Sequence, residues 1–530
     1  MCDTHHKKLR IFIVLQQVRL RLFIFDAKFT QPNPLNPFTM KRPLLHDTTI
    51  LVPLFALLCI SCGRPSTIRD AIMDDRKSFY FIDFDNYPEG NSTLPVGVFD
   101  SGTGGLSVLA DIIEHEGLAN ESYVFLGDLA NMPYGSYALE NNTALLIEHV
   151  MKDVQFLLGN KYYRSAGSRK FETDKIPVKA IVVACNTATA YALDTITRFL
   201  EESGSDIGVI GVIDAGAKGA FGNFSRGENG SIAVMATDGT VKSGAYPETI
   251  HKVNREDGME ETINVFQQAG IGIAEAIDES DDAIDRKATA PRSAYKGPSD
   301  TGAGEMKIDP ALWERYDFDL ENGALLFDGD ATSPVNIQIN SVENYIAFHV
   351  VSLMEKIRNT PGALPLNSVV LACTHYPFFE NTFRDEFNRL RDFSENGEYI
   401  YRPLIAEDLI IVNPASVVAD QLHSHLSAKR LLNSKPGGGC EFYISVPNIL
   451  NKNVELRDDG SFTYDYKYGR TPGDIQEYIK VVPFSRTTIP GDILSRLSQQ
   501  VPALYDMMVS FNRDNPKTKY LTDSERIVKD

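Results

Sequence analysis

Short apolar runs recur along the chain, and small polar residues follow each of them. Residues 96–99 (VGVF), 181–184 (IVVA) and 369–372 (VVLA) are three such runs, and the spacing of 106–113 (LSVLADII) is helical. Apolar runs that alternate with helical stretches predict parallel strands buried on both faces. Ligands bind outside the carboxyl ends of strands in open α/β sheets, so we expect the polar residues after the runs to form a site. The segments that contain these runs are 94–113, 123–138, 179–190, 207–220, 231–246, 368–378 and 409–422.

Two cysteines occupy matching places at the ends of apolar runs. Cys185 lies in IVVACNTAT (181–189), and Cys373 lies in VVLACTHYPFF (369–379). A buried cysteine is by default an inert, small apolar side chain. The repeated setting instead favours one site built from two halves, with a thiol in each half. Cys440 lacks this setting, and we expect it to be structural.

A glycine-rich turn, DSGTGG at 100–105, joins a predicted strand to a predicted helix. Backbone N–H groups at the beginning of a helix form an anion site. The dinucleotide pattern G-x-G-x-x-G fails, because Ser107 stands where the third glycine is needed. Asp100 would repel nearby phosphates, so the turn favours a carboxylate ligand. A plain strand-to-helix turn without a ligand is the alternative.

Length, charge and cysteine spacing limit the classes of partner. The 530 residues are enough for more than one domain, and a formal net charge of -19 repels nucleic acid and anionic lipid, so neither is expected. None of the six cysteines forms a C-x-x-C pair inside the globular region, so we expect no metal site and no disulfide framework.

The segment 40–62 has the order of a secretory signal: two basic residues, an apolar run over about 50–60, and small residues before Cys62. It resembles a bacterial lipoprotein signal with a lipid anchor at Cys62, although Cys59 departs from that pattern. The segment 1–39 would then be a non-native or disordered leader, and the protein would lie in the cell envelope. An uncleaved leader on a cytoplasmic protein is the alternative.

Five motifs occur in order along the chain: VFDSGTGGLSVL, MPYG, ACNTATA, TDGTVKSGAY and LACTHYPF. Together they resemble glutamate racemase, in the aspartate/glutamate racemase superfamily. The resemblance covers roughly residues 94–428. His375 discriminates within the superfamily, because glutamate racemases carry Cys-Thr-His at this point and aspartate racemases usually carry Cys-Thr-Glu.

The resemblance implies an α/β fold of two similar domains with parallel sheets that face each other, and an active site at their interface. The first domain would comprise 94–205 plus 400–530 with a C-terminal elaboration, and the second 206–399 with an exposed insertion around 276–310. We expect 310–328 to fold over the site. In the elaboration, FTYDYKYG (462–469) and YIKVVPF (478–484) predict strands.

Racemisation without a cofactor needs two bases, because one base cannot reach both faces of a Cα. Thiols suit this task, since a free cysteine titrates near ~8.5. By resemblance, Cys185 and Cys373 are catalytic, and Asp100 and His375 assist them respectively. No lysine pattern argues for a Schiff base with pyridoxal phosphate, so no cofactor is expected. The residues that would bind substrate are Ser101, Pro133, Tyr134, Gly135, Asn186, Thr187, Thr237, Thr240 and Thr374.

The function implied is production of D-glutamate for peptidoglycan, hence for cell wall and cell shape. Two alternatives stay open: a racemase of aspartate or another acidic amino acid, and an exported lipoprotein that binds without turnover. Asp214 matches a family glutamate or caps a helix, and Glu343 is a candidate for an acid from the second half. The oligomeric state is open, with a homodimer as one alternative.

Overall fold

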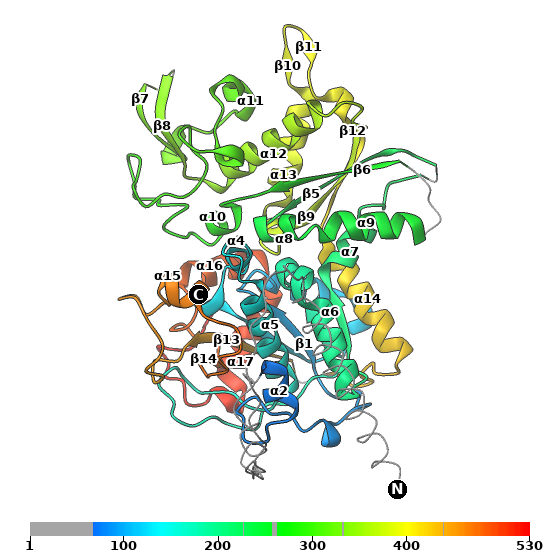
Figure 1. Ribbon diagram of the computed structural model, residues 1–530, viewed down its shortest axis with the longest axis vertical. Coiled ribbons are helices and arrows are strands. Elements are labelled where there is room, and N and C mark those ends of the chain that lie inside the picture. The colour runs from blue at the N-terminus through cyan, green and yellow to red at the C-terminus, as the bar shows by residue number, and fades with distance from the viewer. Residues whose placement is uncertain (1–66, 226, 257–261, 331–332, 438, 530) are drawn as a thin grey trace, which may run out of the picture. The chain divides into compact units, whose positions relative to one another are not determined.

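Two sheets of mainly parallel strands carry the fold (Figure 1). The computed structural model describes residues 67–225, 227–256, 262–330, 333–437 and 439–529. The described residues all belong to one compact unit. The predicted signal segment 40–62, with Cys62, lies outside the described residues. Within the described part of the chain, no helix has the length and apolar character needed to cross a membrane.

The first sheet has six strands, five of them parallel and an antiparallel strand, β14, at one edge. Every residue of its central strand is buried, as the apolar run predicted. Helices cover both faces, and their apolar sides form two cores, one on each face. The strands run in the order β14 (Ile479–Pro483), β13 (Cys440–Pro447), β2 (Tyr123–Gly127), β1 (Val96–Asp100), β3 (Ala180–Val183) and β4 (Gly208–Gly211), and the helices are α2 (Ile68–Met73), α3 (Leu106–Glu114), α4 (Gly135–Leu139), α5 (Thr143–Leu158), α6 (Asn186–Ser203) and α14 (Pro414–Ala428).

The second sheet has four strands, all parallel. All seven residues of β9 are buried, so this strand is covered on both faces. The prediction of an α/β fold with two parallel sheets is confirmed. The strands run in the order β12 (Ile405–Val412), β9 (Leu366–Ala372), β5 (Gly230–Ala236) and β6 (Ile263–Ala269), and the helices are α7 (Val212–Gly219), α8 (Asp238–Ser243), α9 (Ala245–Glu256), α10 (Ile273–Ile277), α12 (Val342–Arg358) and α13 (Glu380–Asp392).

The chain passes between the sheets slightly later than the expected boundaries at 206 and 400. Strand β4 pairs with β3 and so extends the first sheet to Gly211. Strand β12 pairs with β9 and so keeps the returning chain in the second sheet until Val412. The strand pairings fix where the chain passes from one sheet to the other, and residue patterns alone do not reveal those pairings.

The insertion around 276–310 is exposed over much of its length, but both of its ends are buried. Ala283 and Ile308 belong to the core of the second sheet. The stretch 310–328 does not fold over the site as expected: Tyr316 stacks on Phe348 of α12, with ring centroids 5.6 Å apart. The helix α11 (Trp313–Tyr316) and two small antiparallel ribbons complete this region. The first ribbon pairs β7 (Leu325–Asp330) with β8 (Ser333–Ile339), and the second pairs β10 (Ser394–Glu395) with β11 (Glu398–Tyr399).

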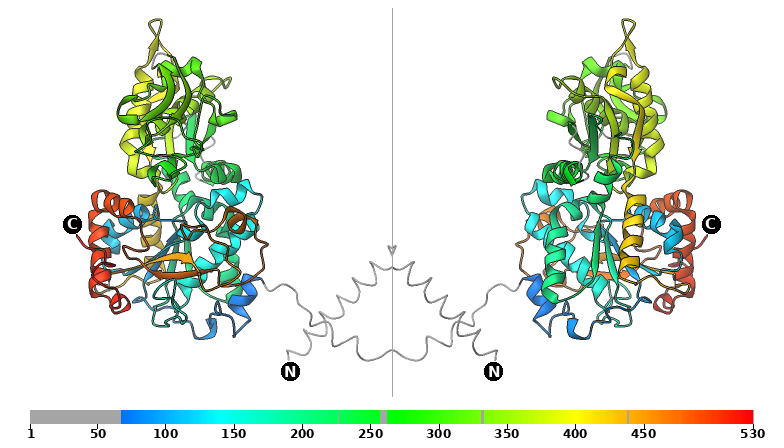
Figure 2. Two further views of the ribbon diagram at one scale, coloured as in Figure 1. Left: turned by 90° about the vertical axis from the view of Figure 1, so that its left-hand side faces the viewer. Right: turned by 90° about the vertical axis from the view of Figure 1, so that its right-hand side faces the viewer.

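The C-terminal elaboration is built into the first sheet, where β13 pairs with β2 and β14 pairs with β13. The predicted strand at 478–484 is therefore confirmed as β14. The predicted strand at 462–469 is wrong, because this stretch forms the helix α15 (Tyr464–Gly469), whose first turn is capped by the Thr463 hydroxyl. Figure 2 shows the last two helices, α16 (Gly491–Gln500) and α17 (Pro502–Asp514), in red beside this sheet.

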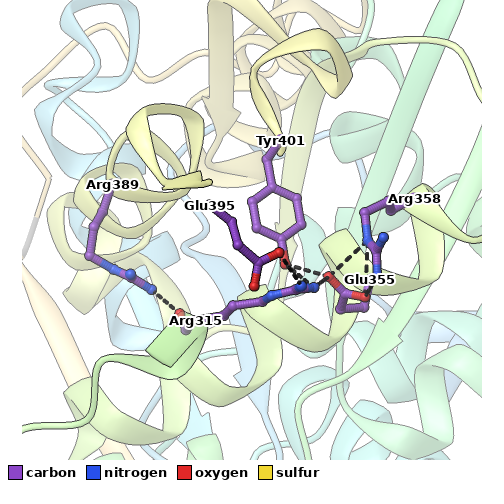
Figure 3. Close-up of polar contacts among 6 residues, drawn as sticks. All are labelled: Arg315, Glu355, Arg358, Arg389, Glu395 and Tyr401. Carbon is purple, nitrogen blue, oxygen red and sulfur yellow. Dashed lines mark hydrogen bonds and ion pairs between the residues drawn. The ribbon is translucent and has the colours of Figure 1, made fainter. Parts of the chain in front are cut away.

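A buried carboxylate fastens the α11 segment to α12 (Figure 3). Glu355 of α12 accepts hydrogen bonds from Arg315 (2.7 Å), from Arg358 (2.6 Å) and from the Tyr401 hydroxyl. Burial raises the pKa of Glu355, but these donors more than offset it, so the pKa is lowered. The pairing therefore stabilises the fold above the unfolded pKa, and this contribution is lost as pH falls through the folded pKa.

We expect Glu355→Ala to lower the free energy of unfolding by about 3 kcal/mol, because it leaves Arg315, whose side chain is only 12% exposed, without its main partner. Urea denaturation measures the loss. Asp392→Ala is the control, since its pair with Arg402 is exposed and its removal should matter far less. Equal losses in the two variants would contradict this account.

Candidate functional site

Both predicted cysteines open on one cavity of about 450 Å³. Cys185 follows β3 of the first sheet, and Cys373 follows β9 of the second sheet. The carboxyl ends of the two sheets thus supply one thiol each to a shared space, at the edge of each sheet where ligands bind.

Most of the predicted site residues line this cavity. Asp100 and Thr240 lie behind its wall, and both are fully buried. Asp214 and Glu343 are exposed, and neither is among the lining residues. Asp214 lies inside α7, whose N-cap is Gly211, so the helix-cap interpretation of Asp214 is wrong. The predicted residues that line the cavity are Ser101, Pro133, Tyr134, Gly135, Cys185, Asn186, Thr187, Thr237, Cys373, Thr374 and His375.

Cys185 is the N-cap of α6 and is 6% exposed. Its sulfur accepts the N–H of Ala188 at 3.5 Å and lies 3.6 Å from the Ser101 hydroxyl oxygen. Burial, with a further contribution from the charge of Asp100, raises the pKa of Cys185 to about 12, against the smaller effect of these hydrogen bonds. Cys185 is therefore held as a protonated thiol at neutral pH.

Cys373 has a different neighbour, because its sulfur lies 3.6 Å from Nδ1 of His375. The other ring nitrogen, Nε2, bonds to Asp278 Oδ2 at 2.9 Å. Burial lowers the pKa of His375, but the charge of Asp278 and its hydrogen bond outweigh this, so the pKa is raised well above its usual value. The ring is thus held as an imidazolium beside the sulfur, where it can stabilise a thiolate.

Asp100 ends β1 and accepts the N–H of Gly102 at 3.0 Å and the Thr374 hydroxyl at 3.4 Å. Burial raises the pKa of Asp100, against the opposing effects of His375 and the N–H groups of the turn. A Cβ on Gly104 would lie 2.5 Å from the Thr374 hydroxyl oxygen, so this close approach of the turn requires glycine. The glycine-rich turn therefore brings Asp100 against the Cys373 segment.

Neutral hydroxyl and amide groups form another part of the wall. The Thr187 hydroxyl, on α6 beside the first sheet, lies 3.1 Å from that of Thr237 and 3.2 Å from that of Thr240. Thr237 caps α8 and Thr240 lies in it, beside the second sheet. The Tyr246 hydroxyl donates to the side-chain oxygen of Asn186 at 2.7 Å. These bonds hold the two halves of the site together and leave hydrogen-bonding groups that suit carboxylate and amino groups.

Tyr134 faces the cavity, but its hydroxyl group is already engaged. The hydroxyl lies 2.6 Å from Asp128 Oδ2 and 2.7 Å from Asp153 Oδ2, and all three side chains are buried. The hydroxyl therefore secures the wall, and contact with a ligand falls to other atoms of Tyr134 and to Gly135.

Some residues of this site do not appear in the sequence-based prediction. Asp278 belongs to the insertion, and its carboxylate also accepts a hydrogen bond from Arg496 of α16 at 2.9 Å. The apolar spacing before Asp278 marks α10, which could have drawn attention to the acid at its end. From the C-terminal elaboration, the cavity is lined by Arg457, Ser461, Phe462, Tyr464, Lys467 and Tyr468.

Among the described residues, no cluster of three or more histidine, cysteine or acidic side chains is arranged to hold a metal ion. The groups around the cavity are suited to proton transfer and hydrogen bonding: two thiols, an imidazolium with its carboxylate, and a second buried carboxylate. Such a set can remove a proton from one side of a bound molecule and return one from the other.

No model of a known protein family matches the chain. It is 36% identical to a glutamate racemase of Lysinibacillus sphaericus over 160 residues, which are 30% of this chain and 49% of that protein. It is 39% identical to a glutamate racemase of Lactobacillus acidophilus over 156 residues, 29% of this chain and 47% of that protein. The chain spans about half the length of the curated relatives it matches.

Solved glutamate racemases also resemble the structure. One from Bacillus anthracis has a TM-score of 0.40 and 22% identity, covering 66% of this chain and 88% of that one. One from Francisella tularensis, in complex with D-glutamate, has a TM-score of 0.38 and 20% identity, covering 72% and 95%. The resemblance to glutamate racemases that the five motifs indicate is confirmed by the similarity in sequence.

Proposed function

We propose that this protein is a cofactor-independent racemase that interconverts L- and D-glutamate. The observation that carries the proposal is that two buried thiols, each at the carboxyl end of a parallel strand, open on the same cavity from different sheets. The sequence similarity to glutamate racemases supports the choice of reaction. D-Glutamate made in this way would serve peptidoglycan synthesis.

The proposed reaction transfers one proton in each of two steps. A thiolate takes the Cα proton, and the electron pair left on Cα is delocalised into the substrate carboxylate. The opposite thiol then gives its proton to the other face of Cα, which inverts the centre and leaves the two sulfurs with exchanged protonation states. Cys373 beside the His375 imidazolium is suited to start as the thiolate, and Cys185, with its raised pKa, as the thiol.

By resemblance, Cys373 faces the Cα proton of L-glutamate and Cys185 that of D-glutamate. The direction that begins with D-glutamate needs Cys185 to lose its proton first. Asp100 is suited to assist, because burial raises its pKa and so makes its carboxylate a better proton acceptor. His375 has the corresponding role for Cys373.

Glutamate is the substrate that we propose, and His375 after Cys373 is the residue that favours it over aspartate. The wall supplied by the C-terminal elaboration favours a second candidate, a larger acidic amino acid, because it adds Lys467 and three aromatic rings to the cavity. A protein that only binds its ligand has no need of two thiols, so the binding-lipoprotein alternative is the weakest.

Proton NMR in deuterated buffer without pyridoxal phosphate tests this function. The Cα proton signal of L-glutamate should disappear as deuterium enters from solvent, whereas that of L-aspartate should persist. Loss of the aspartate signal instead would reassign the substrate. Persistence of both signals in folded protein would refute racemisation of either amino acid.

We expect Cys185→Ser and Cys373→Ser each to reduce racemisation by at least about 10²- to 10⁴-fold, because every turnover needs both thiols. Cys185→Ser should retain some proton exchange from the L enantiomer and Cys373→Ser some from the D enantiomer. Cys440→Ser is the matched control, since Cys440 is equally buried but does not line the cavity. Racemisation that survives in a folded Cys185 or Cys373 variant would eliminate the two-base mechanism.

We expect His375→Asn to lower kcat by about 10²-fold while KM changes little, because the ring handles protons rather than holding the substrate. The raised pKa also predicts a stability effect: the Asp278 pairing stabilises the wild type below an unfolded pKa near ~6.5, and this is lost as pH rises through the folded pKa. Steady-state kinetics and urea denaturation across pH measure the two effects. A change confined to KM would reassign His375 to substrate binding.

We further propose that Cys62 carries a lipid anchor, because basic residues, an apolar run and small residues follow one another in 40–62 as in a secretory signal. Cys62→Ser, expressed in a bacterium, should move the protein from the membrane fraction to the soluble fraction. Equal partitioning of both forms into the soluble fraction would remove the lipid anchor and favour the cytoplasmic alternative.

A further inference from the structure

An arginine from the C-terminal elaboration reaches the Cys373 half of the site through Asp278. Arg496 of α16 donates from Nη2 to Asp278 Oδ1 at 2.9 Å and from Nη1 to the backbone oxygen of Ile277. The other carboxylate oxygen of Asp278 is bonded to His375 at 2.9 Å. Arg496, Asp278, His375 and Cys373 therefore form one continuous chain of polar contacts that ends at a sulfur in the cavity.

These contacts are shielded from solvent, so their charges act strongly on one another. The side chain of Arg496 is 14% exposed, and those of Asp278 and His375 are 6% exposed each. The cations of His375 and Arg496 thus share the carboxylate of Asp278, where solvent screens their charges only weakly. Burial raises the pKa of Asp278, but His375 and Arg496 outweigh it, so the pKa is lowered and the carboxylate is kept ionised.

Other charged groups surround this chain of contacts. On the side of the second sheet they are Glu275 of α10, Asp282 of the insertion and the thiol of Cys373 itself. Asp100 faces His375 from the first sheet. Lys296 pairs with Asp282 at 3.4 Å, whereas the cations bonded to Asp278 itself are the imidazolium of His375 and Arg496.

The role of Arg496 goes beyond filling space between elements. Its guanidinium lies 5.5 Å from the ring centre of Phe378, on the segment that follows His375. Its Nε has no hydrogen-bond partner among the described residues. The hydrogen bonds of the guanidinium recorded in the structure are thus directed at Asp278 and at the end of α10 rather than at its own domain.

We propose that Arg496 is a positioning residue for the proposed racemase: it fixes Asp278 so that His375 is oriented at Cys373, and its charge limits how tightly Asp278 holds the imidazolium proton. The proposal rests on the proposed function. It makes the C-terminal elaboration a working part of the site, since α16 completes the proton-handling group of one of the two bases.

The test compares three variants of the full chain. Arg496→Met removes the charge and the hydrogen bonds, Arg496→Lys keeps the charge, and Arg513→Met removes an exposed charge from the neighbouring α17 as a control. The first measurement is the pH titration of the His375 imidazole by NMR. Its signals are identified by comparison with His375→Asn, whose spectrum lacks them. The second is kcat and KM across pH.

We expect Arg496→Met to raise the pKa of His375 by about one unit, because a cation near the ring is lost and Asp278 is left to His375. Its kcat should fall about 10- to 100-fold with KM nearly unchanged, since small displacements of reacting groups are costly. The alkaline limb of its pH profile should move upward. Arg496→Lys should keep the wild-type pKa of His375 and most of kcat, and Arg513→Met should match the wild type throughout.

An unchanged or lowered pKa of His375 in folded Arg496→Met would overturn the proposal, as would equal damage in Arg496→Lys and Arg496→Met. If the methionine variant does not fold, Arg496→Gln replaces it with the same expected shift. The imidazole titration does not depend on turnover, so it still decides the role of Arg496 if the wild type fails to racemise glutamate. Failure of that wild-type reaction would refute the proposed function instead.

Discussion

The hydrogen-bonded ion pair between His375 and Asp278 is the interaction on which the arrangement of the site depends. It joins the segment after β9 to the end of α10, and Arg496 extends it to the C-terminal elaboration. Because all three side chains are shielded, the pair stays in place only while each charge has its partner. The position of His375 at Cys373 is therefore a property of three parts of the chain together.

The two thiols experience opposite surroundings, and this difference gives the site its chemistry. Cys185 lies near the carboxylate of Asp100, which together with burial favours the protonated sulfur. Cys373 lies beside an imidazolium, which favours a negative sulfur. Two groups of the same type thus have different charged neighbours, which is the arrangement that the proposed transfer of a proton across a planar centre uses. The neutral hydroxyl groups of the wall suit a ligand with two negative charges without competing for the protons.

The additions to the chain support the site rather than surround it as loose loops. The insertion supplies Asp278, and its neighbouring stretch is fastened to α12 through Glu355. The C-terminal elaboration extends the first sheet by β13 and β14 and lines the cavity with α15. Both additions are thus held by the same burial and pairing that hold the two sheets.

The sequence by itself determined the α/β class, the buried strands and the two thiols at strand ends, because these depend on apolar runs and on residues next to them in the chain. Local pattern was misleading at 462–469, where alternating aromatic residues suggest a strand. Phe462 forms only an isolated bridge with Leu456, and the Thr463 cap then begins a helix. The tertiary structure alone brought Asp278 to His375 and Arg496 to Asp278, across 97 and 218 residues of chain. Contacts over such separations arise from strand order and packing, which cannot be read from residues adjacent in the chain. They set the charges that surround the His375 ring.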